Sequence, residues 1–595
     1  MKLLLFLLLC SLSLNAQDFN YIRSWGTYFG DERFSLQDSK VDSQGNLYIV
    51  GTIANRNLAT PIYSTPNTHQ PNYGGGELDG FIAKFNNLGQ LTWASYFGGE
   101  GVDVISGIDI DSNDNIYLVG CTDSLINIAT AGAFQSNLAG NTDFFISSFS
   151  PNGSLLWSTY YGGNAEDSER NFGGASFFDS TNKRVFITHD KSDNFYIAGY
   201  SNSENLGTSG SFQPIRGESN QIISKFDDTG NRIWATYFNV DGNYITGISA
   251  TENELYIRGK SVDCSINHSP NSYCGTSNGY QPLPSNCIDS FLSKFSSSGQ
   301  RIWGTYYGGF SIVNSNSVKT FQDKVYISGQ SYTNNSIITT SGAFQETTLN
   351  EAAPFLVQFN PNSTRNWGTY NGTNTGFAVN GGNSYSANIS LDTTGNIYLS
   401  GSTVLHSNIA TEGAYQSGFA DSNSGYISKF DVNGNKIWGS YYNGNSNEFD
   451  LIIHPYLRNF YLVGSTSSTA GMTTSDCLQP NFTIIDTANI ADYPTNIFIA
   501  HFEPNALSTT TNQLENTTLY PNPNKGNFNL QGNFSGIENL ELKIYDNQGR
   551  NVFSKNNTSI QNKNTITIAT TLASGVYFVK VFNESLSKTY KMIVR

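Results

Sequence analysis

The sequence predicts an all-β protein, a seven-bladed β-propeller followed by a small C-terminal β-sandwich. Three observations lead to this prediction. Tyr (34), Phe (39) and Gly (57) are abundant and only 13% of residues are charged, which suits short strands joined by tight turns. All seven Trp residues stand in one recurring phrase. The C-terminal residues 517–595 carry a separate strand pattern of their own.

The recurring phrase is a Trp followed by a small residue, by Ser or Thr, and by Tyr. Successive copies start 64 to 77 residues apart. A near-constant period of this length indicates a repeat architecture in which each copy is one structural unit. The copies begin at Trp25, Trp93, Trp157, Trp234, Trp303, Trp367 and Trp438.

Three further markers recur between successive Trp residues. They are a hairpin such as residues 41–48 with a second strand that ends in Gly, a loop phrase such as Gly132–Gln135, and a strand that ends in Phe, such as Phe81–Phe85. Each repeat therefore predicts four short antiparallel strands, counting the one that contains Trp. Such four-stranded units arranged around an axis form a β-propeller, here expected over residues 17–504.

The order of the markers also predicts how the ring closes. The first Trp phrase precedes every hairpin, whereas the last Phe strand, residues 497–502, has no Trp phrase after it. We therefore expect residues 22–29 to supply the outer strand of the last blade. An open array would instead leave an exposed sheet edge at each end.

The repeat resembles the SBBP-type β-propeller repeat of secreted bacterial proteins. The residues that carry the resemblance are Ser158–Gly163, Asp111–Gly120, Gly132–Gln135 and Asp143–Phe149. The resemblance implies the propeller fold and does not imply a ligand.

A polar stretch rich in Thr and Asn, residues 505–516, reads as a linker to a second domain over residues 517–595. In that domain Leu540, Leu542 and Ile544 alternate with polar residues and precede a turn, as in a small β-sandwich.

The C-terminal domain carries a set of motif residues, which are Tyr520, Pro521, Asn522, Pro523, Gly526, Gly575, Tyr577 and Lys580. On these residues it resembles the type A sorting domain of the type IX secretion system of Bacteroidetes. The resemblance implies Sec export, passage across the outer membrane and the type IX secretion machinery as a partner. An ordinary adhesion-like sandwich is the alternative.

Residues 1–16 read as a signal peptide. Lys2 precedes an apolar run, and Ala16 before Gln17 offers a cleavage site. A lipoprotein site at Cys10 is a weaker alternative, because Leu9 is larger than the residue such a site prefers. No later segment reaches the roughly 18 apolar residues of a membrane helix, so no integral membrane segment is expected. We expect a secreted protein that is either released or anchored at the outer cell surface.

The charge distribution excludes two classes of partner. The chain carries a net charge of −15, and residues 17–510 hold 22 basic against 42 acidic side chains, a net of −20. This field repels nucleic acid and anionic lipid, so neither is an expected partner.

Cysteine spacing bears on both disulfides and metals. Cys264, Cys274 and Cys287 stand close together in a Ser- and Asn-rich stretch, which favours one disulfide among the three and leaves the pairing open. Cys121 lies in an apolar strand pattern and reads as a small buried residue. The Cys and His residues show no zinc-ligand spacing, and we expect neither a metal nor a cofactor.

The sequence shows no catalytic motif. The six His residues form no HExxH, and no GxSxG elbow or phosphate loop occurs. Residues 109–115 resemble a calcium loop but align with the hairpin turns of the other repeats and lack the distal Glu. The Trp residues could stack on sugars, but their place in a repeated strand favours packing between blades.

We therefore expect a non-catalytic binding or adhesion protein that takes a glycan or protein ligand through its loop face. The most irregular loops are residues 53–78 and 262–288. An extracellular polysaccharide lyase or hydrolase with a site on a propeller face is the alternative, and a structural cell-envelope component is a third reading.

Overall fold

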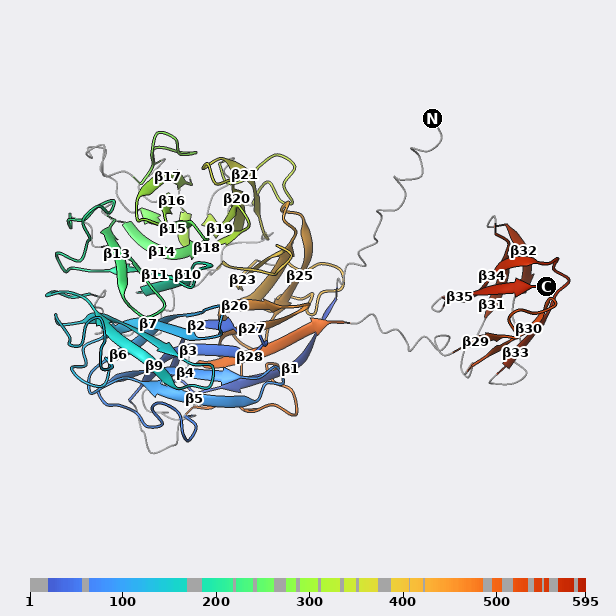
Figure 1. The fold of residues 1–595 in the computed structure, drawn as a ribbon, viewed down its shortest axis with the longest axis horizontal. Coiled ribbons are helices and arrows are strands. Elements are labelled where there is room, and N and C mark those ends of the chain that lie inside the picture. The colour runs from blue at the N-terminus through green and yellow to red at the C-terminus, as the bar shows by residue number, and fades with distance from the viewer. Residues whose placement is uncertain are drawn as a thin grey trace. The chain divides into compact units, whose positions relative to one another are not determined.

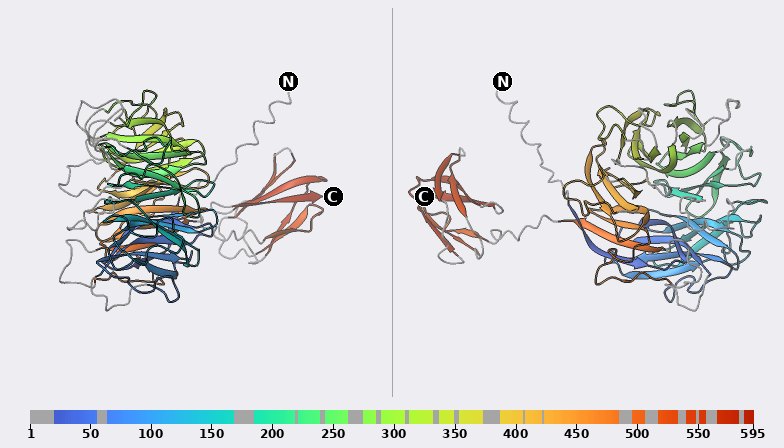
Figure 2. Two further views of the ribbon diagram at one scale, coloured as in Figure 1. Left: turned by 60° about the vertical axis from the view of Figure 1, so that its left-hand side comes forward. Right: turned by 180° about the vertical axis from the view of Figure 1, so that it is seen from behind.

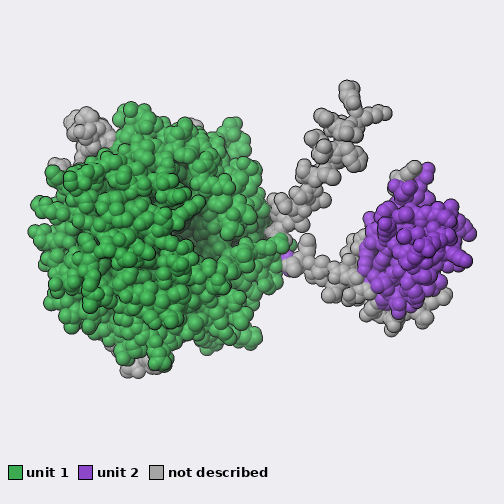
Figure 3. All heavy atoms as spheres, viewed as in Figure 1, with its two compact units in different colours: residues 1–504 green, residues 505–595 purple. Residues whose placement is uncertain are grey.

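The computed structural model divides the chain into two compact units, residues 1–504 and 505–595 (Figure 3). The described residues contain strands and no helix, which confirms the all-β class. The expected signal peptide with Ala16 and Gln17, and most of the expected linker, lie outside the described residues. The structure describes residues 20–55, 64–167, 185–217, 221–238, 243–261, 274–284, 289–308, 312–331, 337–348, 353–372, 387–405, 407–420, 423–484, 495–505, 517–532, 540–547, 550–555, 565–582 and 587–595.

The described part of the first unit forms seven four-stranded antiparallel sheets, here numbered blades 1 to 7 in chain order (Figure 1). Blades 1 to 4 are β2(Phe34–Val41), β3(Leu47–Ala54), β4(Leu78–Phe85) and β5(Leu91–Phe97); β6(Asp103–Ile110), β7(Ile116–Thr122), β8(Asp143–Phe149) and β9(Leu155–Tyr161); β10(Val185–His189), β11(Phe195–Tyr200), β12(Gln221–Phe226) and β13(Arg232–Tyr237); β14(Asn243–Ala250), β15(Glu254–Ser261), β16(Asp289–Ser296) and β17(Arg301–Tyr307). Blades 5 to 7 are β18(Ile312–Phe321), β19(Lys324–Ser331), β20(Ala353–Phe359) and β21(Arg365–Tyr370); β22(Asn388–Leu391), β23(Ile397–Thr403), β24(Ser424–Phe430) and β25(Lys436–Tyr442); β26(Glu448–Tyr456), β27(Asn459–Thr466), β28(Asn496–Pro504) and β1(Tyr21–Phe29).

The first strand of each blade lies innermost, and these strands contact one another in a closed cycle. In order around the cycle they are β2, β6, β10, β14, β18, β22 and β26, and β26 contacts β2 again. Figure 2 shows the blades from two further sides. The seven sheets therefore surround a central channel whose wall is made by their innermost strands.

Blade 7 combines strands from both ends of the unit. β1 pairs antiparallel with β28, so that Thr27 lies opposite Ile499 and Tyr28 opposite Phe498. A bulge between Arg23 and Trp25 shifts the register once. Because β1 continues directly toward β2 of blade 1, this pairing joins the last blade to the first.

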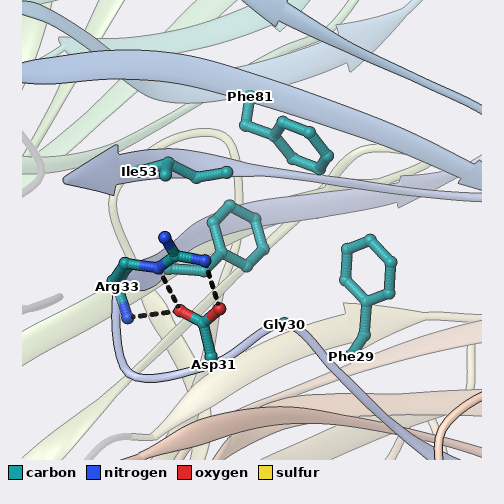
Figure 4. Close-up of a pocket in the computed structure, with 7 residues that line it drawn as sticks. Phe29, Gly30, Asp31, Arg33, Ile53 and Phe81 are labelled. Carbon is teal, nitrogen blue, oxygen red and sulfur yellow. Dashed lines mark hydrogen bonds and ion pairs between the residues drawn. The ribbon is translucent and has the colours of Figure 1, made fainter. Parts of the chain in front are cut away.

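A buried ion pair lies in the connection between β1 and β2 (Figure 4). The Arg33 guanidinium donates from Nε and Nη2 to the two carboxylate oxygens of Asp31, over 2.9 and 2.7 Å. Both side chains are at most 3% exposed. Phe29, Phe34 and Phe81 pack around the pair, so the two charges must compensate each other.

The recurring Trp residues join neighbouring blades. The indole N–H of Trp93 donates to the backbone carbonyl of Pro151 in the outer turn of the next blade, over 3.1 Å. A side chain added at Gly153 in that turn would lie 2.9 Å from the Trp93 ring, which explains the recurring glycine. The same bond runs from Trp25, Trp157, Trp234, Trp303 and Trp367 to Asn87, Asp228, Ser297, Pro361 and Val432.

Trp438 is the exception, and its position explains why. The outer strands of blade 7, β28 and β1, come from opposite ends of the unit, so no turn joins them to receive the indole. Trp438 donates instead to the carbonyl of Gly413, over 3.3 Å. The ring of Tyr21 in β1 covers it at a centroid distance of 5.0 Å. Trp438 is therefore fully buried where the ring closes.

The second unit is a two-sheet sandwich. One sheet holds β29(Thr518–Tyr520), β30(Asn527–Gln531) and β33(Thr565–Ala569), and the other holds β32(Asn551–Lys555), β31(Glu541–Tyr545), β34(Gly575–Phe582) and β35(Ser587–Val594). Phe528, Ile568, Leu542, Ile544 and Val579 belong to the shared core between them.

Candidate functional site in the central channel

The channel encloses about 370 Å³ and is lined by residues from all seven innermost strands. Figure 3 shows a hollow in the face of this unit turned toward the viewer. The lining contains both apolar and polar residues. Its polar members include Asp38, Lys40, Lys319, Asn388 and His454.

Three innermost strands meet at a charge cluster formed by Lys40, Asp109 and His189. The Asp109 carboxylate lies 3.0 Å from Lys40 Nζ and 3.1 Å from His189 Nδ1. It also accepts the backbone N–H of His189 over 2.9 Å. Although burial opposes ionisation, Lys40 and His189 hold the pKa of Asp109 well below its usual range. The cluster therefore ties blades 1, 2 and 3 together around one carboxylate.

The second nitrogen of His189 does not face the channel. Nε2 is buried without a hydrogen-bond partner among the described residues, and the ring packs against Tyr117 at 4.5 Å. A general base must reach the proton that it removes, and this nitrogen is closed off from solvent. In this geometry the cluster acts as a structural junction.

Other polar side chains of the innermost strands also connect neighbouring blades. Ser39 Oγ and His454 Nε2 are 2.7 Å apart and link blade 1 to blade 7. Ser249 and Thr320 link blades 4 and 5 through hydroxyl groups 3.0 Å apart, and Asn388 donates to a carbonyl of blade 7. Many polar groups of the channel wall thus stabilise the ring itself.

A pair of buried carboxyl groups flanks Gly98 between blades 1 and 2. A side chain added at Gly98 would lie 2.6 Å from Asp79 Oδ1 and 2.8 Å from Asp103 Oδ2, so only glycine fits. Asp103 accepts hydrogen bonds from the Gly99 N–H at 2.7 Å and the Ser124 hydroxyl at 2.8 Å. Both carboxyl groups are fully buried and hold the loops around them.

The same arrangement recurs one blade further, where Asp143 and Asp167 flank Gly162. Burial raises the pKa of Asp143 to about 6, and it raises the pKa of Asp79 to about 8 and that of Asp103 to about 6. Perturbed carboxyl groups often mark active sites. These four are closed off from solvent, which assigns them to the scaffold.

The buried carboxyl groups predict a stability that falls as the pH rises from about 4 through the folded-state pKa values. Their folded-state pKa values exceed the ordinary Asp value of 3.8, so the folded chain binds protons more tightly than the unfolded chain. This stabilisation is complete below about pH 4 and is lost as the pH rises through the folded-state values. We expect the melting temperature of the first unit to fall between pH 5 and 9, and Asp79→Asn to reduce that fall. Trp fluorescence during thermal unfolding measures it, because every Trp lies in this unit.

Asp323→Asn is the control, since Asp323 is exposed. An unchanged pH slope in Asp79→Asn would contradict the assignment. Asp109 has the opposite pH dependence, because its pKa is lowered in the folded state. Its contribution to stability is present above about pH 4 and is lost as the pH falls and the carboxylate becomes protonated.

The candidate calcium loop is a hairpin turn. Asp111 caps the turn by accepting the backbone N–H groups of Asn113 and Asn115 over 2.9 and 2.8 Å. Its neighbour Asp109 points instead to the channel cluster. Within the part of the chain that the structure describes, no group of three His, Cys, Asp or Glu side chains could hold a metal ion.

Several other sequence predictions have a definite place in the structure. Cys121 is buried in a blade interface. Cys274 is also buried, but Cys264 and Cys287 lie outside the described residues, so the disulfide stays a prediction. Large parts of the two irregular loops, residues 56–63, 262–273 and 285–288, lie outside them as well.

The Lys40–Asp109–His189 cluster was not predicted from the sequence, because its members are 69 and 80 residues apart and belong to no motif. A usable signal was present. Each of the three stands one or two positions before the turn aspartate of its hairpin, Asp42, Asp111 or Asp190. Aligning the repeats on that aspartate would have placed all three on innermost strands.

The expected sorting-motif residues take structural roles in the second unit. The side chain of Asn522 binds the edge strand β35. Its amide N–H donates to the Lys591 carbonyl over 2.7 Å, and its amide oxygen accepts the Ile593 N–H over 2.8 Å. Tyr520, Pro521 and Pro523 form the segment around it, with cis peptide bonds before both prolines. Gly526 has a φ of 92°, Gly575 begins β34, Tyr577 faces the core and Lys580 faces outward.

Comparison with known families identifies two segments. Residues 518–595 match the family described as secretion system C-terminal sorting domain, and residues 92–127 match the family described as beta-propeller repeat. No curated protein matches the chain closely. The second unit is thus a sorting domain of the type handled by the type IX system, which indicates secretion and attachment at the cell surface. No helix in the described residues is long and apolar enough to cross a membrane.

The solved structures to which the chain is similar share about one residue in ten with it. The polysaccharide lyase Uly1 is 10% identical and has a TM-score of 0.35, with 79% of this chain and 90% of that chain covered. An ulvan lyase with a bound saccharide is 10% identical with a TM-score of 0.36, covering 75% and 92%. A Synechocystis apocarotenoid oxygenase is 10% identical with a TM-score of 0.32, covering 76% and 89%. Likeness at this level says nothing about activity.

Proposed function

We propose that the propeller is a non-catalytic binding or adhesion module, delivered to the cell surface by its sorting domain, that takes a glycan or protein ligand at the channel mouth and the loops around it. The observation that supports this most is that the titratable groups with shifted pKa values are paired with other protein groups or buried. Asp109 is held between Lys40 and His189, and the perturbed carboxyl groups beside Gly98 and Gly162 are fully buried. Catalysis needs such groups in contact with a substrate.

A rigid ring with long irregular loops suits binding. Loops on a stable scaffold commonly carry recognition, and the repeated Trp joints and ion pairs supply the stable scaffold here. The net charge of −20 over residues 17–510 favours a neutral or basic ligand surface over a polyanion.

The test is retention of the purified chain, from residue 17 onward, on a panel of immobilised polysaccharides and cell-surface proteins. The same samples are assayed for new reducing ends and for unsaturated ends. We expect retention without product. Product formation would overturn the proposal and establish the lyase or hydrolase alternative, and absence of any retention would also contradict it.

A pair of charge reversals tests the position of the site. Lys319 lines the channel, whereas Lys324 stands directly after the turn of the same hairpin, outside the channel lining, and is about one third exposed. We expect Lys319→Glu to change retention and Lys324→Glu to leave it unchanged. Equal effects of the two variants would contradict binding at the channel.

A further inference from the structure

The two outer faces of the sorting domain differ sharply. The outward residues of β30 and β33 are small or neutral and polar. They are Asn527, Asn529, Gln531, Thr565, Thr567 and Ala569. On these two strands the apolar residues are directed to the core and the polar residues to water, as in an ordinary solvated sheet. The edge strand β29 adds one aromatic residue to this face, because Tyr520 lies opposite Asn529 and is 43% exposed.

The other outer face, on β31, β34 and β35, is aromatic and basic. Val576 is 39% exposed and Phe578 is 41% exposed, although both lie on β34, which has paired strands on both sides. We call this surface the basic aromatic face. Its members are Lys543, Tyr545, Val576, Phe578, Lys580, Phe582, Lys591 and Ile593.

The strand register brings these side chains into one continuous patch. Phe578 lies between Tyr545 on β31 and Lys591 on β35. Lys580 lies opposite Lys543 in the next row, and both ammonium groups stand about 5 Å from the Phe582 ring, at 5.2 and 5.0 Å. Cross-strand neighbours on one face are close enough to be contacted together by a partner.

The fold does not require this pattern. In the segment Gly575–Lys580, Tyr577 and Val579 fill the core, whereas Val576, Phe578 and Lys580 point away from it. On the opposite sheet, β30 and β33 direct only small or polar residues outward. An exposed aromatic and aliphatic row flanked by cations is typical of an interaction surface, where large rings supply the contact energy.

We propose that the basic aromatic face is the surface by which a component of the type IX secretion machinery holds the sorting domain, through an acidic patch around an apolar groove. Two observations select this partner. Residues 518–595 match a family defined by its role in secretion, and the outward residues belong to the segment that the sequence reading assigned to the sorting motif. Glu541, which lies 3.6 Å from Lys543, is the one acidic residue on the three strands. The face therefore keeps a net positive charge, which favours an acidic partner surface. The proposal does not depend on what the propeller binds.

The experiment follows surface delivery of the full chain in a host with a functional type IX system. One variant carries Lys543→Gln, Lys580→Gln and Lys591→Gln, and a second carries Phe578→Ala alone. We expect each to lower the amount at the cell surface by about tenfold or more, with accumulation in the periplasm, as for loss of a central contact residue.

The control variant carries Asn527→Asp, Gln531→Glu and Thr567→Glu on the opposite face, which changes the net charge by the same amount. We expect wild-type delivery. Thermal unfolding and trypsin resistance of each purified full-length variant establish that the domain is folded. Wild-type delivery of the folded basic-aromatic variants would overturn the proposal, and so would an equal loss in the folded control.

Discussion

Replacing Trp438 by alanine is expected to lower the free energy of unfolding of the propeller by about 3–5 kcal/mol. Trp438 is fully buried, and Tyr21 and Phe460 pack against it at 5.0 and 6.3 Å. The substitution removes contacts between blade 6 and both chain ends of blade 7. Denaturant unfolding followed by Trp fluorescence measures the loss, since the remaining Trp residues all lie in the propeller.

Trp367→Ala is the matched control for this prediction. Trp367 forms the ordinary joint to the turn of the next blade and keeps part of its ring exposed. We expect a clearly smaller loss, because less apolar surface leaves the protein interior. A loss in Trp367→Ala equal to that in Trp438→Ala would contradict a special role for Trp438 where the ring closes.

Asp31→Asn is expected to destabilise the propeller by about 3–5 kcal/mol, because it removes the carboxylate charge that two hydrogen bonds hold against the buried Arg33 guanidinium. Arg33 and Asp31 are at most 3% exposed and share two hydrogen bonds in the connection from β1 to β2. Burial lowers the pKa of Arg33, but the hydrogen bonds that Arg33 donates to Asp31 outweigh this effect and raise it. The guanidinium therefore stays charged.

The exposed pair of Lys324 and Asp323 offers the comparison. Asp323 is 67% exposed, and exposed pairs contribute roughly 0–1 kcal/mol. We expect Asp323→Asn to leave the denaturation midpoint nearly unchanged. If Asp31→Asn behaved like Asp323→Asn, the account of this junction would be wrong.

The fold could be predicted because the repeat markers have the same physical task in each copy. Each of the first six Trp phrases supplies an indole that binds the turn of the next blade. In five of these turns a glycine leaves room for the ring, and in the turn that Trp303 binds Ser363 stands at this position with a positive φ. Such local rules leave a visible period in the sequence. The closure of the ring could be predicted as well, because the unmatched first Trp phrase belongs to β1, the strand that pairs with β28.

The channel could not be predicted in the same way. Lys40, Asp109 and His189 come together only because three innermost strands converge, and each position is occupied by unrelated residues in the other blades. The buried carboxyl groups of Asp79 and Asp103 beside Gly98 were not predicted either, because no sequence motif indicates that these residues come into contact. Sites assembled from single substitutions in a repeat carry no linear motif.

In the sorting domain, one segment contains residues whose place the sequence predicts and a residue whose place it does not. Tyr577 and Val579 follow from the alternation of a half-buried strand, and the motif residues around Asn522 follow from the resemblance. The exposed Phe578 breaks the alternation rule. Local disagreement with such a rule is expected at a functional surface.

The pairing of β1 with β28 is tested most directly by a disulfide between Ile22→Cys and Glu503→Cys, which lie opposite each other in the register. Paired strand positions fall within the distances that a disulfide can span. A protease site introduced between residues 217 and 221 then allows the chain to be cut. We predict that the cut halves stay joined on a denaturing gel until reductant is added, and that neither single variant keeps them joined. Halves that separate without reductant in the double variant would contradict a ring closed by its N-terminal strand.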